Sequence, residues 1–271
     1  MASTMRSAPM AAPADELSGI ERLLLVVPLL GGAFFGLVPL LFPDLLAAWA
    51  GAPGNDHYMY WLAGTATFGY AVALALGVRQ PAWAPVRMLV AAVLTFNLAS
   101  LYTCALEIAG GSARPIVYLI CGTSVALVGL CAALLARHRG AADGPPNIAP
   151  WLVWLLRVAT LLAAIFGLLP LLAPVTFVQL GGGQGTDIFL YRQAGAATLG
   201  YATMGLLQLR SRHWAALRLP AVMGLAFNGL ACAASLVAIA GGTGGWLAYP
   251  VALASLGVAL GSALALRRGG Q

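Results

Sequence analysis

The sequence predicts an all-α membrane protein with eight transmembrane helices, arranged as two parallel repeats of four helices each. Hydrophobic residues make up 61% of the 271 residues and charged residues only 8%, whereas soluble domains average roughly 45 to 50% and 25%. The apolar residues gather in long runs, and the chain matches itself when it is shifted by 131 residues. This composition excludes a soluble globular domain.

Each apolar run has the length of about 20 residues that a helix needs to cross the hydrocarbon core of a bilayer. The runs are continuous and rich in Leu and Ala, and they do not alternate between apolar and polar residues, so helices rather than barrel strands are predicted. The predicted spans are residues 20–42, 58–78, 87–109, 115–136, 151–172, 189–209, 217–240 and 246–266.

The internal match defines the repeats. Residues 20–137 align without a gap with residues 151–268, and about forty of the 118 positions are identical. Four helices in each unit bring the second repeat into the membrane from the same side as the first, so the two repeats are expected to be parallel. Residues 1–19 are expected to form a disordered cytoplasmic tail, and residues 138–150, rich in Gly and Pro, a cytoplasmic linker.

All 14 basic residues are Arg, so lysine-based Schiff bases and phosphate loops are excluded. Twelve of the arginines fall on the side of both termini, and only Arg114 and Arg192 fall on the other. Because arginine near short loops stays in the cytoplasm, both termini are predicted to be cytoplasmic, with the protein in the inner membrane of a bacterial cell. The arginines are scattered singly, which does not suggest nucleic-acid binding.

Two asparagines are predicted near the middle of the membrane. Asn97 and Asn228 occupy equivalent positions in the third helix of each repeat, at a depth similar to that of Tyr70 and Tyr201. An unsatisfied amide in hydrocarbon costs several kcal/mol. Each amide is therefore expected either to bond across helices, for example to the tyrosines, or to face a polar ligand or a path for water.

Two equivalent aspartates precede the second helix of each repeat. Asp56 and Asp187 are placed to cap the free amides of those helices. The alternative is capture of a cation or proton at an outer vestibule, together with Tyr60, Tyr191 and His57.

Two charged residues on the outer side have no counterpart in the other repeat. Glu107 corresponds to Ala238, and Arg192 corresponds to Trp61. Glu107 is expected to anchor at the interface or to pair with Arg114, and an acid within a span is also a functional candidate. Arg192 is expected to pair with Asp187 or with an anionic lipid headgroup.

Other features favour packing over chemistry. The pairs Gly64 with Gly69 and Gly195 with Gly200 allow close approach of helices. Tryptophans near span ends, including Trp83, resemble the aromatic belts of membrane proteins. The cysteines lack metal-site spacing and the histidines lie near span ends, so no metal site, cofactor site or catalytic residue is predicted.

Each repeat resembles the small DoxX-like four-helix membrane proteins of bacteria. In each repeat the resemblance lies in the Leu-x-x-Pro end of the first helix, the Ala-Gly-x-Ala-Thr-x-Gly-Tyr-Ala segment of the second helix and the Arg that opens the third. The matching residues are Pro43/Pro174, Gly64/Gly195, Gly69/Gly200 and Arg87/Arg218. A single-bundle family would be doubled here. The resemblance implies a possible association with quinone-linked oxidoreductases and assigns no catalytic residue.

We therefore expect an integral membrane protein without catalytic activity. It would act as a subunit or scaffold beside other membrane subunits, or bind a lipophilic molecule such as a quinone or lipid. The alternatives are a transporter of a small solute or ion, with its path between the two repeats, and an intramembrane enzyme. A transporter needs a wet polar cleft between the repeats, whereas an enzyme needs titratable groups that converge.

Overall fold

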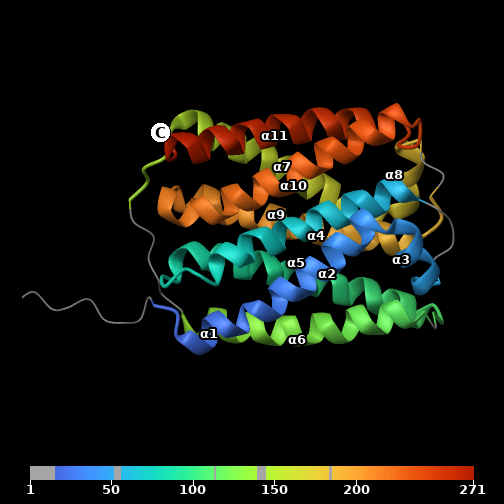
Figure 1. Cartoon of the computed structure of the whole chain (residues 1–271), viewed down its shortest axis with the longest axis horizontal. Coiled ribbons are helices and arrows are strands. Elements are labelled where there is room, and N and C mark those ends of the chain that lie inside the picture. The colour runs from blue at the N-terminus through green and yellow to red at the C-terminus, as the bar shows by residue number, and fades with distance from the viewer. Residues whose placement is uncertain (1–15, 52–55, 113, 139–144, 183–184) are drawn as a thin grey trace, which may run out of the picture.

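The structure, a computed structural model, describes residues 16–51, 56–112, 114–138, 145–182 and 185–271, which form a bundle of long helices (Figure 1). Helix α1 begins at the end of the bundle where the C-terminus also lies, and we call this the terminal end. The short helices α3 and α8 lie at the opposite, distal end. The helices in the described residues are α1 (Gly19–Leu24), α2 (Val26–Leu41), α3 (Pro43–Ala50), α4 (His57–Gly77), α5 (Ala84–Ala109), α6 (Pro115–Arg137), α7 (Pro150–Leu172), α8 (Pro174–Leu180), α9 (Ile188–Ser211), α10 (Trp214–Ala240) and α11 (Ala248–Arg268).

Seven helical segments of the described chain are long and apolar enough to cross a membrane, which makes this an integral membrane protein. Helices α1 and α2 count as one such segment, Gly19–Leu41; the others are α4, α5, α6, α7, α10 and α11. The eighth expected span, residues 189–209, forms the 24-residue helix α9, which is not among the seven. It carries Arg192, Gln193, Gln208 and Arg210, and these polar residues lower its hydropathy.

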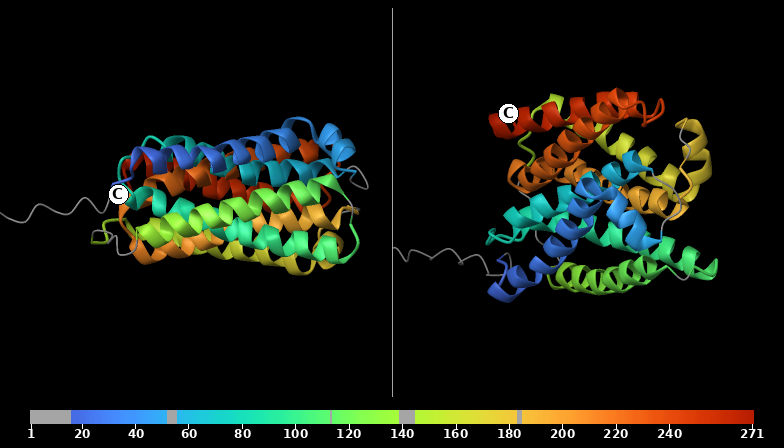
Figure 2. Two further views of the ribbon diagram at one scale, coloured as in Figure 1. Left: turned by 90° about the horizontal axis from the view of Figure 1, so that it is seen from below. Right: turned by 45° about the vertical axis from the view of Figure 1, so that its right-hand side comes forward.

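The packing of the helices links the N-terminal half of the chain (residues 16–138, the N-half) to the C-terminal half (residues 145–271, the C-half). Helix α4 packs extensively on α2 of its own half and on α10 of the other half. Helix α9 likewise packs on α7 and on α5, whereas the contacts of α4 with α5 and of α9 with α10 are few. The helices keep a common direction when the molecule is turned (Figure 2). Each half thus contributes one helix to the packing of the other.

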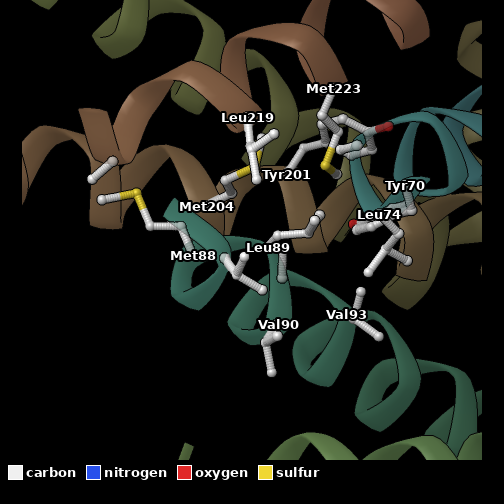
Figure 3. Close-up of a cluster of buried hydrophobic side chains, with 14 of the residues drawn as sticks. Tyr70, Leu74, Met88, Leu89, Val90, Val93, Tyr201, Met204, Leu219 and Met223 are labelled. Atoms are coloured by element: carbon white, nitrogen blue, oxygen red, sulfur yellow. The ribbon is translucent and has the colours of Figure 1, made fainter. Parts of the chain in front are cut away.

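The main hydrophobic core lies between the halves. It joins Tyr70 and Leu89 from α4 and α5 to Tyr201 and Met223 from α9 and α10, with all four side chains buried. Figure 3 shows these side chains converging from helices of both halves. Close packing of this kind leaves little free volume at the centre of a protein.

Glycines let the first two long helices of each half approach closely. A Cβ on Gly64 of α4 would lie 2.7 Å from the carbonyl oxygen of Gly36 on α2. At the equivalent place in the C-half, a Cβ on Gly195 of α9 would lie 2.6 Å from the carbonyl oxygen of Gly167 on α7. The expectation that Gly64 and Gly195 serve helix packing is therefore confirmed.

The short helices α3 and α8 were not predicted. Both begin with a proline at the first helical position, Pro43 and Pro174. Proline has no N–H and is favoured at the first position of a helix, where that N–H would be unpaired. The preceding residues have nearly the same conformation, φ −135° and ψ 56° at Phe42 and φ −131° and ψ 58° at Ala173. The chain therefore turns in the same way at both places.

The terminal end differs from the expected tail and linker. Residues 1–15 lie outside the described residues, but Leu17 is buried, and Ser18 caps α1 in a capping box with Glu21. The ordered chain therefore begins at least three residues earlier than expected, because this segment packs on the loop before α5, where Leu17 donates its N–H to the carbonyl of Pro81.

His138, assigned to the linker, is also part of the fold. Its Nε2 lies 2.9 Å from a carboxylate oxygen of the buried Glu21, and the Nε of Arg137 lies 3.2 Å from the same oxygen. The ring of Trp83 stacks on His138 with 4.7 Å between centroids. Trp83 is fully buried, so its assignment to an aromatic belt at the lipid surface was wrong. Residues 139–144 of the linker lie outside the described residues.

Candidate functional site

Two cavities lie on either side of the central core. The N-half cavity, of about 130 Å³, is lined by α2, α3, α4, α5 and α6 and by the first turns of α9. The C-half cavity, of about 160 Å³, is lined by α7, α9, α10 and α11 and by two residues of α4, Met59 and Leu62. Cavities of roughly 150 Å³ with apolar walls take up benzene in other proteins. Each cavity is thus large enough to hold a ring-sized group.

The same positions of the two halves line the two cavities. Of the 26 residues around the N-half cavity, 21 have a counterpart 131 positions away that lines the C-half cavity, 19 of them later in the chain and two earlier. Eight of these pairs are identical residues: Phe35/Phe166, Pro39/Pro170, Ala63/Ala194, Thr67/Thr198, Tyr70/Tyr201, Phe96/Phe227, Asn97/Asn228 and Ser124/Ser255. The shared positions give both cavities a mostly apolar wall with an aromatic and amide edge toward the core.

The two tyrosines hold the halves together. The hydroxyl of Tyr70 on α4 donates to the carbonyl of Ala197 on α9, 2.8 Å away, and the hydroxyl of Tyr201 on α9 donates to the carbonyl of Ala66 on α4, 2.7 Å away. Their rings meet edge to face with centroids 4.9 Å apart. Each tyrosine thus makes the same contact with the helix of the other half that its counterpart makes in return. Both hydroxyls are occupied by backbone carbonyls, so these tyrosines act first as packing residues.

The asparagines bond within their own helices. The Nδ2 of Asn97 donates to the carbonyl of Val93, and the Nδ2 of Asn228 donates to the carbonyl of Gly224, each four residues earlier. The suggested bond between the asparagines and Tyr70 or Tyr201 is thus not formed among the described residues, because the tyrosine hydroxyls are turned to the opposite helix. Both amides instead line a cavity, Asn97 in the N-half and Asn228 in the C-half.

An ion pair closes the distal end of the N-half cavity. The guanidinium of Arg114 donates from Nη1 and Nη2 to the two carboxylate oxygens of Asp187, at 3.0 and 3.2 Å. The Asp187 side chain is only 4% exposed and that of Arg114 20%. The Arg114 guanidinium also lies 5.3 Å from the ring centroid of Phe189, within the range of a cation–π contact. The pair connects the start of α6 to the start of α9, and therefore the N-half to the C-half.

The two aspartates cap helices, as predicted. Asp187 Oδ1 accepts from the N–H of Leu190 at 3.4 Å, and Asp56 Oδ1 accepts from the N–H of Met59 at 3.3 Å. Their second partners differ. Asp56 accepts a hydrogen bond from the hydroxyl of Tyr191, whereas Asp187 binds Arg114.

The predicted vestibule partners are divided. Tyr60 lines the N-half cavity together with Asp187, whereas Tyr191 bonds to Asp56. The Nε2 of His57 lies 2.5 Å from Asp44 of α3 instead of contacting Asp56. The two aspartates thus have different hydrogen-bond partners, and His57 does not contact Asp56.

The charged residues predicted on the outer side form ion pairs that differ from those predicted from the sequence. Glu107 pairs with Arg192, with 3.7 Å between Oε1 and Nη1, whereas Arg114 pairs with Asp187. The predicted pairs Glu107 with Arg114 and Arg192 with Asp187 were therefore wrong. The reason lies in the helix exchange, because α9 packs on α5 and brings Arg192 to Glu107.

A polar group on α5 and α9 was missed in the sequence. Gln193 accepts from the hydroxyl of Ser100 at 2.8 Å and donates to the hydroxyl of Thr103 at 2.5 Å. Ser100 and Gln193 line the N-half cavity. The equivalent positions around the C-half cavity hold Ala231 and Leu62, which are apolar. This mismatch between the repeats was the available signal, since a glutamine in a span needs partners.

The C-half cavity is polar at its other end. It extends toward the terminal end, where Thr160, Gln208 and Ser262 line it. The N-half has Leu29, Gly77 and Cys131 at the equivalent positions. These C-half residues carry no charge, so the C-half cavity lacks an ion pair such as Arg114 with Asp187.

In the part of the chain that the structure describes, no three His, Cys, Asp or Glu side chains are grouped so that they could hold a metal ion. A scan against family models and searches of curated proteins and of solved structures find no match for this chain.

Proposed function

We propose that the protein is a non-catalytic membrane protein that binds a lipophilic molecule, such as a quinone or a lipid, in its helical bundle. The pair of cavities with matching walls carries this proposal. Binding sites for small molecules are mostly apolar cavities with a few polar groups that orient the ligand. Asn97 and Asn228, each at the edge of an apolar cavity, fit that description.

The position of the cavities favours binding over transport. A transport path between the halves would run through the space that Tyr70, Leu89, Tyr201 and Met223 fill. The cavities instead lie among the helices beside this core. A role beside other membrane subunits, as the DoxX-like resemblance implies, is compatible with binding of this kind.

We further propose that α9 is the eighth membrane span and that the halves are parallel repeats. Helix α9 lies between α5 and α7, both of which are apolar enough to cross, and it is shielded from lipid by them. The distribution of arginines places both termini in the cytoplasm of a bacterial cell, with the protein in the inner membrane.

Thiol labelling tests this topology. The four cysteines are replaced by Ala, and the single changes Ser112→Cys at the distal end and Gln271→Cys at the terminal end are then made. An impermeant thiol reagent applied to intact cells should label only the protein with Ser112→Cys. Labelling of the protein with Gln271→Cys before lysis would contradict the orientation.

Direct binding tests the function. The purified protein in lipid nanodiscs is titrated with decylubiquinone, and binding is followed by quenching of tryptophan fluorescence. Native mass spectrometry of the same sample identifies any lipid that remains bound after purification. Saturable binding at a stoichiometry of one or two is expected, and its absence together with the absence of any retained lipid would reject the proposal.

Two substitutions taken from the repeats themselves show where the ligand binds. Gly31 lines the N-half cavity where the C-half has Leu162, and nothing lies within 4 Å of a Cβ added to Gly31. Gly224 lines the C-half cavity where the N-half has Val93. The change Gly31→Leu therefore fills the N-half cavity, and Gly224→Val fills the C-half cavity, each with a residue that the fold already accepts in the other half.

A further inference from the structure

We propose that the N-half cavity is specific for an uncharged amphiphile whose head group carries a carbonyl oxygen, bound against Arg114. The inference rests on the proposed binding function. It adds which of the two cavities binds the head group and which chemical group of the ligand is recognised. The C-half cavity, on the same argument, accepts hydrocarbon or a ring without selecting a charged or carbonyl-bearing head group at its distal end.

The two cavities differ most at their ends. Five residues around the N-half cavity have no counterpart around the C-half cavity: Ala50, Tyr60, Arg114, Asp187 and Phe189. All five come from the distal end, from α3 and from the starts of α4, α6 and α9. Gly245 occupies the position equivalent to Arg114. The C-half therefore folds without an ion pair at this place.

The ion pair is poorly explained by stability. Burying two charges costs about as much as their attraction returns, and apolar replacements are often as stable. Asp56 shows that the same capping position is satisfied by a tyrosine hydroxyl instead of an arginine. A partly buried guanidinium beside an apolar cavity is more consistent with ligand recognition.

The charge balance selects an uncharged ligand. Asp187 already neutralises Arg114 through two hydrogen bonds, so an anionic head group would compete with a carboxylate that is only 4% exposed. A guanidinium has five N–H donors, and Asp187 uses two of them. The Nε of Arg114 is enclosed by protein and has no hydrogen-bond partner among the described residues, which leaves the second N–H of Nη1 and of Nη2 for a ligand. A spare donor in an electrically balanced pair suits a neutral acceptor such as a carbonyl oxygen.

The rest of the cavity suits an apolar ring and chain. Asn97 and Ser100 add hydrogen-bonding groups between Arg114 and the aromatic edge of Tyr70 and Phe96. Helices α2 and α6 both line the cavity but pack only weakly on one another. A hydrocarbon chain can therefore leave the cavity between these two helices toward the lipid.

The test compares three ligands that share a decyl chain and differ in the head group. Decylubiquinone carries carbonyl oxygens and no charge, decylbenzene has no polar head group, and decyl phosphate is an anion. Each is titrated into the full-length protein in nanodiscs of uncharged lipid. The proteins are the unchanged chain, Gly31→Leu, Gly224→Val and the double change Arg114→Gln with Asp187→Asn, which removes both charges and keeps a side chain that can cap α9.

A matched control uses the other ion pair at the distal end. The double change Glu107→Gln with Arg192→Gln also removes two charges that join the halves, but neither residue lines the cavity. If the Arg114 variant unfolds, as judged by gel filtration and thermal unfolding, the change Gln193→Leu with Ser100→Ala replaces it. The replacements are the residues at the equivalent positions around the C-half cavity, Leu62 and Ala231.

We expect decylubiquinone to bind most tightly and Gly31→Leu to remove this binding while Gly224→Val does not. The double change of Arg114 and Asp187 should weaken the binding of decylubiquinone by about tenfold or more, which is the effect of losing a hydrogen bond to a charged group. It should leave the affinity for decylbenzene unchanged. The control variant with changes at Glu107 and Arg192 should bind both ligands as tightly as the unchanged protein.

Three results would overturn the inference while the binding function stands. These are tighter binding of decyl phosphate than of decylubiquinone, loss of decylubiquinone binding in Gly224→Val instead of Gly31→Leu, and equal effects of the two double changes. If none of the three ligands binds the unchanged protein, the proposed function fails as well.

Discussion

The N-half and C-half cavities have the same walls but different ends. Their shared positions are those that pack helices or face the core, such as Tyr70 with Tyr201 and Phe96 with Phe227. The N-half cavity has charged and polar groups at the distal end, whereas the C-half cavity has neutral polar groups at the terminal end. The two halves thus share residues that determine packing and differ at the two ends of their cavities. The difference at the ends is where we look for specificity.

The largest expected effect concerns the ion pair that only the N-half cavity has. The change Arg114→Leu leaves Asp187 buried without its cation and should destabilise the protein by about 3 to 5 kcal/mol. Adding Asp187→Asn should restore most of the loss, because the second change removes the stranded charge and keeps the cap. Unfolding in detergent by SDS or heat measures both. If Arg114→Leu alone costs no more stability than the double change, the Asp187 carboxylate is well solvated without its cation.

The next effect compares equivalent glycines of the two halves. A Cβ on Gly36 would lie 2.7 Å from the backbone of Phe68, and a Cβ on Gly167 would lie 2.9 Å from the backbone of Leu199. Gly36→Ala and Gly167→Ala should each cost about 1 to 3 kcal/mol, since backbone atoms cannot move aside as a side chain can. Gly36→Ala should cost more. Gly31→Ala, with nothing within 4 Å of the added carbon, is the control and should stay within about 1 kcal/mol of the unchanged protein. Equal costs at all three glycines would show that close approach is not the cause.

The sequence predicts the long helices well, because apolar length and helix caps are local properties. Seven of the eight expected spans correspond to apolar helices, and both Asp56 and Asp187 cap the helices that they precede. The sequence does not predict which helices become neighbours. Hydropathy does not reveal that α5 packs on α9 and α10 packs on α4, each in the other half. This packing determines the partners of Arg192 and Arg114.

The candidate site is predicted only in part for the same reason. Asn97 and Asn228 stand out as amides in apolar runs, and both line cavities. The cavities themselves depend on packing between helices far apart in the chain. Gln193 meets Ser100 from a position 93 residues away, and no local pattern joins them. The buried pair of Glu21 and His138 likewise joins the two ends of the N-half.

A smaller effect tests the symmetry of the hydrogen bonds between the halves. Tyr70→Phe and Tyr201→Phe each remove one hydroxyl bond between α4 and α9. Such bonds in membrane proteins contribute about 0.6 kcal/mol on average and at most about 1.7 kcal/mol. The two changes should therefore have similar small costs in thermal unfolding. Because the rings touch, the double change should differ from the sum of the single ones, and strongly unequal single costs would contradict the equivalence of the halves.

The smallest expected effect on stability, and the sharpest comparison of the cavities, concerns the asparagines. Each amide donates to a carbonyl of its own helix that also serves the helical backbone, so Asn97→Leu and Asn228→Leu remove no bond between helices. The free energy of unfolding should change by less than about 1 kcal/mol in either variant, because the lost bond is offset by the removed desolvation of the amide. Ligand binding should separate them. Asn97 lies in the same cavity as Arg114, whereas Asn228 has no charged neighbour around its cavity. Asn97→Leu should therefore weaken the binding of decylubiquinone several-fold, whereas Asn228→Leu should not. A fluorescence titration of proteins with matched thermal stability measures this difference. Equal loss in both variants would show that the two cavities bind the same head group and that their different ends do not set specificity.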